Sequence, residues 1–112
     1  MITLLVTTSP KTKNLLTKYL EFSGIDEDYI FHADNKDDIE LLMSAYEFDL
    51  ILAEGFGSFL NEKDIPRIDI KSRKHKSSMS KMNDSYITTP IQIIDIKNLV
   101  KAVTNSLIKM AS

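Results

Sequence analysis

Apolar and polar residues alternate along the chain in a pattern that predicts five β-strands. Four short runs are mainly apolar and end at polar or turn-forming residues, as buried strands do. A fifth stretch alternates polar and apolar residues, which predicts a strand with one dry and one wet face. The apolar runs are residues 2–6, 29–33, 48–53 and 85–88, and the alternating stretch is 67–71. Within the third run, Leu50, Ile51, Leu52 and Ala53 are apolar without interruption, so this strand should be buried on both faces.

Apolar residues spaced three or four positions apart predict three helices among these strands. The first follows the first strand, the second follows the second strand, and the last follows the fifth. Their apolar positions are Leu15, Leu16, Tyr19 and Leu20; Ile39, Leu42, Met43 and Tyr46; and Leu99, Val100, Val103, Leu107 and Met110. The order of the first half is therefore β-α-β-α-β, which favours a parallel sheet covered on both faces.

The ends of these helices have residues typical of caps. Ser9 is expected to cap the first helix, with Pro10 at its first helical position. Gly24 follows this helix as a stop. Asp34 or Asn35 should cap the second helix. For the last helix we expect Asp95 as the cap and a hydrophobic staple from Ile94 to Leu99.

The region after the third strand is less regular. Eleven residues separate Glu54 from Pro66, and a parallel crossover normally needs about a dozen or more. Residues 72–83 are rich in Lys and Ser, and only Met79 and Met82 can be buried, so a helix there should be short, frayed or formed on binding. We therefore predict one α/β domain over residues 1–112, a small doubly wound parallel five-stranded sheet with the third helix shortened or absent and the fourth poorly formed.

Composition fits a globular protein and excludes several classes of site. The chain is 43% hydrophobic and 27% charged, which is ordinary for a globular protein. It has no cysteine, so disulfides, a thiolate nucleophile and sulfur-ligated metal are excluded. The opening apolar run is much shorter than a membrane span or the core of a signal peptide. A cytoplasmic location without membrane contact is expected.

Charge is distributed unevenly along the chain. Residues 21–64 carry thirteen acidic side chains against Lys36 and Lys63, whereas residues 67–81 carry six basic side chains against Asp69. The basic residues are Arg67, Lys71, Arg73, Lys74, Lys76 and Lys81. Such asymmetry favours a charged partner or head-to-tail self-association. The alternative is that these charges only solvate a loop and the outer faces of helices.

Glu54 is the first candidate for a functional residue. It follows the uninterrupted apolar run directly and precedes Gly55 and Gly57, so it should lie at the carboxyl end of a buried strand, where open α/β sheets place their sites. The alternative is an ordinary surface carboxylate. His32 alternates with Phe31 and Ala33, and we interpret it as a histidine on the polar face of a strand.

Four segments in the right order resemble the receiver domain of two-component response regulators. Residues 4–10 (LLVTTSP) are similar to the family's first strand and its acidic pair, and residues 30–54 to its second strand, second helix and third strand, ending at the phosphoacceptor. Residues 65–72 (IPRIDIKS) are similar to its fourth strand, and 84–91 (DSYITTPI) to the stretch that ends its fifth. The resemblance implies a flavodoxin/CheY-like fold and a cis peptide bond before Pro90.

The phosphorylation chemistry implied by this resemblance needs residues that the chain lacks. Thr7 and Thr8 stand at the positions of the Mg²⁺-binding acids, and Glu54 stands at that of the aspartate acceptor. Lys71 replaces the switch hydroxyl and Thr89 the lysine. A Lys71–Glu54 pair is one expectation for the rebuilt pocket, and Lys71 in solvent is the other. The resemblance thus implies a pseudo-receiver without Mg²⁺ or another cofactor.

These observations favour a phosphorylation-independent signalling and regulatory module rather than an enzyme. We expect it to act through protein–protein contacts, with a protein partner or as a homodimer, through the basic segment 67–81. The first alternative is an anion- or phosphate-binding, phosphocarrier-type domain that uses the helix N-terminus at Thr7, Thr8 and Ser9. The second is nucleic-acid contact through the basic segment, which is less favoured because no aromatic residues are interleaved with its basic ones.

Overall fold

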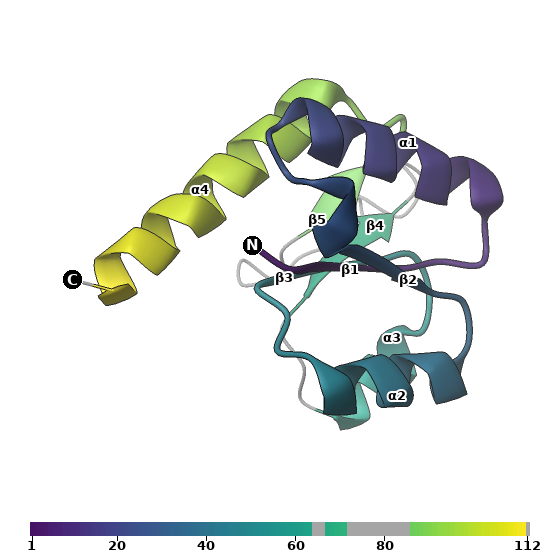
Figure 1. Ribbon diagram of the computed structural model, residues 1–112. Helices are drawn as coiled ribbons and strands as arrows, with labels where there is room; N and C mark the ends of the chain where they lie inside the picture. The colour runs from purple at the N-terminus through teal and green to yellow at the C-terminus, as the bar shows by residue number, and fades with distance from the viewer. Residues whose placement is uncertain (64–66, 72–85, 112) are drawn as a thin grey trace.

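The computed structural model describes residues 1–63, 67–71 and 86–111, and its centre is a parallel sheet (Figure 1). The five strands lie in the order β2-β1-β3-β4-β5. They are β1 (Thr3–Val6), β2 (Ile30–Ala33), β3 (Leu50–Ala53), β4 (Ile68–Lys71) and β5 (Tyr86–Thr88). The predicted small parallel five-stranded α/β domain is confirmed, and each strand lies within the stretch that the hydrophobic pattern indicated.

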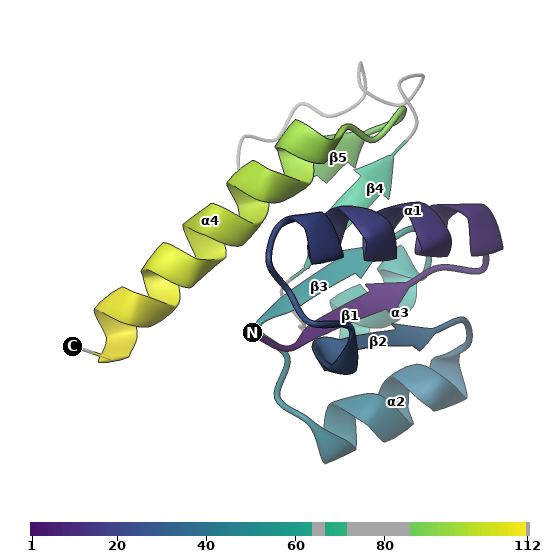
Figure 2. The ribbon, with the colours of Figure 1, turned by 45° about the horizontal axis from the view of Figure 1, so that its top comes forward.

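The helices cover both faces of this sheet, as Figures 1 and 2 show. Leu16 and Leu20 of α1 pack with Ile96 and Val100 of α4 against one face. Ile39 of α2 and Leu60 of α3 pack against the other. The helices are α1 (Pro10–Phe22), α2 (Lys36–Ala45), α3 (Gly57–Glu62) and α4 (Ile93–Ala111), with a 3-10 turn η1 (Glu27–Tyr29) before β2. The sheet is therefore doubly wound, as predicted.

The register of β1, β2 and β3 brings their carboxyl ends level. Val6 pairs with Ala33 on one side and with Ala53 on the other. Two backbone hydrogen bonds extend the pairing by one residue, from Thr7 N to Ala33 O at 3.1 Å and from Glu54 N to Val6 O at 2.8 Å. The residues that follow β1 and β3 consequently leave the sheet side by side.

The first two helix caps agree with the prediction, and the last does not. Ser9 accepts a hydrogen bond from Thr12 N, and Asn35 accepts one from Asp38 N. The prediction that Asp95 caps the last helix is wrong, because α4 begins at Ile93 and Asp95 lies in its first turn. Its N–H already donates to the Gln92 carbonyl at 3.1 Å.

The predicted staple fails for the same reason. Ile94 lies inside α4 and is 52% exposed, so it does not precede the helix as a staple residue must. Ile96, with no exposed surface, and Val100 anchor the helix in the core instead. None of the helices in the described part of the chain is long and apolar enough to cross a membrane.

The helix that follows β3 on the α2 side of the sheet is short. Helix α3 has only six residues, which confirms the prediction of a shortened third helix. Ile68 and Ile70 face the core formed with α1 and α4, so the side chains that alternate with them on β4 face the other way. The predicted weak fourth helix falls in residues 72–85, which lie outside the described residues.

Candidate functional site

The carboxyl ends of β1 and β3 place Thr7 and Glu54 in direct contact. The hydroxyl of Thr7 donates a hydrogen bond to one carboxylate oxygen of Glu54, with Oγ1 and Oε1 2.8 Å apart. Thr7 is almost fully buried at 1% exposure, and Glu54 is half-buried. A short, partly buried bond to an ionised acceptor is among the stronger hydrogen bonds in proteins.

A second hydroxyl holds the other oxygen of the same carboxylate. Thr12 Oγ1 lies 3.4 Å from Glu54 Oε2, which makes this the longer of the two bonds. Thr12 belongs to the first turn of α1, where the helix dipole attracts negative charge. The carboxylate therefore serves as an internal anion at the N-terminus of α1.

Backbone and side-chain bonds keep these hydroxyl groups in place. Ser9 N donates to Thr7 Oγ1 at 3.0 Å, and Ser9 Oγ accepts from Thr12 N at 3.2 Å. His32 Nε2 lies 3.0 Å from the Thr7 carbonyl oxygen and donates to it. His32 thus supports the end of β1, in agreement with its interpretation as a strand histidine.

The loop that carries Glu54 has an unusual backbone. Gly55 and Phe56 follow Glu54 with φ angles of 93° and 61°, so both lie in the left-handed region. For phenylalanine this conformation costs about 1–2 kcal/mol. Its half-buried side chain packs against the core under α2 and α3, which offsets that cost. The direction of this loop is therefore set by the packing of Phe56 as well as by the conformation of Gly55.

Lys71 ends the neighbouring strand β4, and Thr89 directly follows β5. Thr89 N donates to the Lys71 carbonyl at 3.0 Å, and the Thr89–Pro90 peptide bond is cis, as the resemblance implied. The two hydrogen bonds described for the Glu54 carboxylate come from hydroxyl groups, and the expected Lys71–Glu54 pair stays a prediction. Glu54 turns toward β1 and the first turn of α1, where the hydroxyls of Thr7 and Thr12 hold its carboxylate.

The described contacts join two residues of the set expected from the sequence. Thr7 and Glu54 come together, whereas Thr8 next to them is exposed. Sequence reasoning missed Thr12 as a site residue. The available signal was its place three residues after the Ser9 cap, where a side chain in the first helical turn lies near the carboxyl end of the sheet.

The donor groups of this site do not suit a divalent cation. Mg²⁺ and Ca²⁺ are bound mainly by carboxylates, carbonyls and water. Thr7 and Thr8 supply neutral hydroxyls, and the one carboxylate already accepts two hydrogen bonds. Among the side chains that the structure describes, no three histidine, aspartate or glutamate residues are grouped to hold a metal.

One of the predicted basic interaction residues is engaged inside the molecule. Arg67 Nε lies 2.7 Å from Asp69 Oδ1, and the two side chains are 14% and 23% exposed. Lys71 ends β4 and is half-buried. The remaining members of the predicted set, Arg73, Lys74, Lys76 and Lys81, lie outside the described residues.

Comparison with known proteins relates the chain to solved structures rather than to known sequences. No family model and no curated protein matches the sequence. The two component transcriptional regulator AraC from Clostridium phytofermentans has a TM-score of 0.74 at 16% identity, covering 99% of this chain and 97% of that one. A response regulator receiver modulated diguanylate cyclase from Pelobacter carbinolicus has a TM-score of 0.72 at 13% identity, over 97% and 96%.

A third similar structure is the signal receiver domain of a histidine kinase from Syntrophus aciditrophicus. Its TM-score is 0.68 at 21% identity, and the alignment covers 95% of this chain and 92% of that chain. At such low identity the likeness concerns the fold. The chain has the CheY-like receiver fold.

Proposed function

We propose that the chain is a receiver-like signalling module that works without phosphorylation and acts through contacts with other proteins. The observation that supports this most is the state of the Glu54 carboxylate. Both of its oxygens accept hydrogen bonds from hydroxyl groups of the chain, Thr7 Oγ1 and Thr12 Oγ1. The group at the phosphoacceptor position of a receiver is thus engaged as a structural anion.

Phosphoryl transfer to Glu54 would lack its electrostatic support. Such a reaction needs cations that stabilise the charge developing on the transferred group. Thr7 and Thr8 are uncharged where receivers have acids that hold Mg²⁺, and Thr89 is uncharged where they have lysine. We therefore assign no step of phosphoryl transfer to Thr7, Thr8 or Thr89, and we propose no enzymatic activity.

Glu54 is also a poor built-in mimic of a phosphoryl group. A phosphoryl group drives the receiver switch by contacts toward the ends of the fourth and fifth strands. The carboxylate of Glu54 is held instead toward β1 and the first turn of α1. A domain that stays in one state, or is switched by something other than phosphate, fits this geometry better.

Anion binding at the N-terminus of α1 is a less favoured function. The hydroxyls that would bind phosphate, those of Thr7 and Thr12, already donate to Glu54. Ser9 N, another donor at this end, is bonded to Thr7 Oγ1. Inorganic phosphate would have to break these bonds and approach a like charge. An anion therefore has to compete with a carboxylate that is covalently part of the chain.

The protein partner is proposed to bind at the basic segment, residues 67–81. Because Arg67 is paired with Asp69, we place the partner's contacts at Arg73, Lys74, Lys76 and Lys81. Replacing Lys74 and Lys76 with Glu should weaken partner capture steeply at low salt and leave the melting temperature nearly unchanged. Unchanged capture in this variant would contradict the proposed segment. Selective loss of RNA or DNA retention would favour the nucleic-acid alternative instead.

Intact-mass spectrometry after incubation with acetyl phosphate and Mg²⁺ tests the absence of phosphorylation. We expect no covalent adduct, because Thr7 and Thr8 stand where receivers have the Mg²⁺-binding acids and Thr89 stands where they have lysine. The matched control is Glu54→Asp, which supplies the usual acceptor but leaves Thr7, Thr8 and Thr89 in place, and it should also remain unmodified. A stoichiometric, Mg²⁺-dependent adduct on Glu54 would overturn the proposal.

A further inference from the structure

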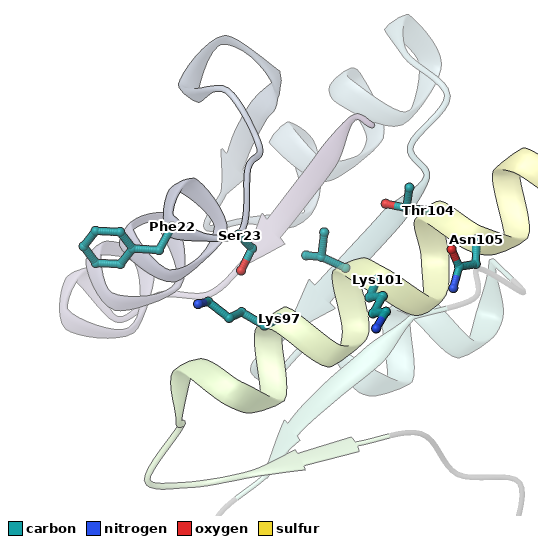
Figure 3. Close-up of a pocket in the computed structure, with 7 residues that line it drawn as sticks. Phe22, Ser23, Lys97, Lys101, Thr104 and Asn105 are labelled. Carbon is teal, nitrogen blue, oxygen red and sulfur yellow. The ribbon is translucent and has the colours of Figure 1, made fainter.

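A groove opens between the last residues of α1 and the middle of α4, at the amino end of the sheet (Figure 3). Phe22 and Ser23 form one wall, and Val100 lies at its base with 7% exposure. Lys97 and Lys101 lie one turn apart along the other wall, followed by Thr104 and Asn105. The described lining contains no acidic side chain, so the groove combines apolar surface with positive charge.

Phe22 gives this groove an exposed apolar anchor. Its side chain is 64% exposed although it ends an otherwise well-packed helix. Among the described large hydrophobic residues only Leu41, at 67%, is more exposed. Large exposed apolar side chains next to charged groups are typical of contact surfaces.

Leu41 lies in surroundings that complement the groove. It is in α2, and helical spacing places Asp37 and Asp38 within one turn of it on the N-terminal side and Ala45 one turn away on the other. Asp37, Asp38 and Ala45 are exposed. The outer face of α2 therefore presents an apolar side chain flanked by carboxylates and followed by a small residue that allows close approach.

We propose that the groove binds the outer face of α2 of a second copy of this chain. Leu41 would pack against Phe22 and Val100, while Asp37 and Asp38 would lie near Lys97 and Lys101. The complementary charges favour this pairing over like-charged surfaces. Helix α2 itself carries Asp37, Asp38 and Glu40 against Lys36, and this net negative charge adds attraction toward the basic groove.

The position of the two surfaces determines the kind of assembly. Helix α2 covers one face of the sheet, and α1 and α4 cover the other, so one molecule presents the two surfaces on opposite sides (Figure 1). The contact is therefore head-to-tail, which leads to rings or open chains rather than a closed dimer. A single helix face buries less area than a stable dimer needs, so the association is transient.

Sedimentation velocity of the full chain tests this association. The weight-average sedimentation coefficient should rise with protein concentration up to about 1 mM in about 50 mM salt, as a weak contact requires. Raising the salt to about 500 mM should weaken the association about tenfold or more, because exposed charges are then screened. A chain that stays monomeric at every concentration would overturn the proposal and leave the groove to a different partner.

A charge swap tests which surfaces meet. The groove variant carries Lys97→Glu and Lys101→Glu, and the helix variant carries Asp37→Lys and Ala45→Lys. Asp38 is left intact because it exchanges hydrogen bonds with the Asn35 cap. Each variant alone should remain monomeric because its two surfaces then carry like charges. An equimolar mixture should associate again, since each altered surface meets the opposite charge on the other variant.

The controls separate this contact from folding and from net charge. Lys11→Glu with Lys13→Glu changes net charge as much as the groove variant but leaves the groove intact, so it should sediment like the wild type. Circular dichroism should show that all variants melt as folded domains. Failure of two folded variants to associate when mixed would overturn the proposal. The outcome is independent of phosphorylation, because neither surface includes Glu54 or Thr7.

Discussion

The two ends of helix α1 differ in whether the charged groups beside them are paired within the chain. At its first turn, Thr12 and the preceding Thr7 bind the carboxylate of Glu54. At its last turn, Phe22 borders a groove whose lysines, Lys97 and Lys101, take part in no ion pair among the described residues. The first end is thus satisfied within the chain, and the second presents charge and apolar surface outward.

This difference shows that the two ends of one helix can contribute unequally to folding and to binding. We call Thr7, Thr12 and Glu54, at the carboxyl end of the sheet, the carboxyl-end site. Its hydroxyl and carboxylate groups are hydrogen-bonded to one another, which stabilises the loops that carry them. The charges of the groove are exposed instead, so they contribute little to folding and remain available for binding. Substitutions at the two ends should therefore separate stability from association.

Truncation of the groove's support should have the largest effect. Ile96→Ala removes a fully buried side chain that holds α4 against α1 and the sheet. We expect the free energy of unfolding to fall by about 2–5 kcal/mol, measured by urea denaturation. Lys97→Ala on the adjacent exposed position should change it by less than about 0.5 kcal/mol. Similar losses in both variants would mean that α4 is not anchored as described.

Removal of the Thr7 hydroxyl should destabilise the carboxyl-end site. Thr7→Val leaves one oxygen of Glu54 and the N–H of Ser9 without their partner, at a cost of about 1–3 kcal/mol in unfolding free energy. Thr8→Val is the matched control, because this neighbouring hydroxyl is exposed, and it should cost less than about 0.5 kcal/mol. Equal urea midpoints for the two variants would contradict the structural role of Thr7.

The Thr12 hydroxyl should contribute less than that of Thr7. Its bond to Glu54 is 3.4 Å long, near the limit for a hydrogen bond, and Thr12 is only half-buried. We expect Thr12→Val to lower the unfolding free energy by about 0.5–1 kcal/mol, since helix propensity is nearly unchanged. The double variant with Thr7→Val shows whether the two hydroxyls act through the same carboxylate, because their effects should then be non-additive.

Phe22→Ser should have the smallest effect on stability. The side chain is 64% exposed, so the substitution should change the unfolding free energy by less than about 0.5 kcal/mol. Thermal unfolding measures this change. The same substitution should weaken self-association clearly, because it removes the apolar anchor of the groove. A large loss of stability with unchanged association would contradict the role of Phe22 in binding and show that this end of α1 supports the fold instead.

The sequence predicted most of the features that depend on residues close to one another in the chain, such as strand positions and helix caps. The apolar runs located β1 and β3, and the Ser9 cap followed from local spacing. The start of α4 was missed because Ile91 and Ile96 fix it by packing in the core, which no local pattern reveals.

The site itself was predicted only in part. The resemblance brought Thr7 and Glu54 to neighbouring strand ends, and the structure places them in contact. It could not show which way the Glu54 side chain turns, because adjacent strands on both sides offered polar groups. The bond to Thr12 joins residues 42 positions apart, and its geometry depends on the direction of the loop through Gly55 and Phe56.

The proton–nitrogen correlation spectrum of the labelled chain in the presence of beryllofluoride and Mg²⁺ tests the central claim most directly. Beryllofluoride occupies the place of a phosphoryl group on a receptive carboxylate with a bound metal ion. Because Thr7 and Thr12 already hold Glu54, we predict that the amide signals of these three residues and of Thr89 stay where they are. Saturable, Mg²⁺-dependent shifts of those signals would show that the site still accepts a phosphoryl group and would contradict the account.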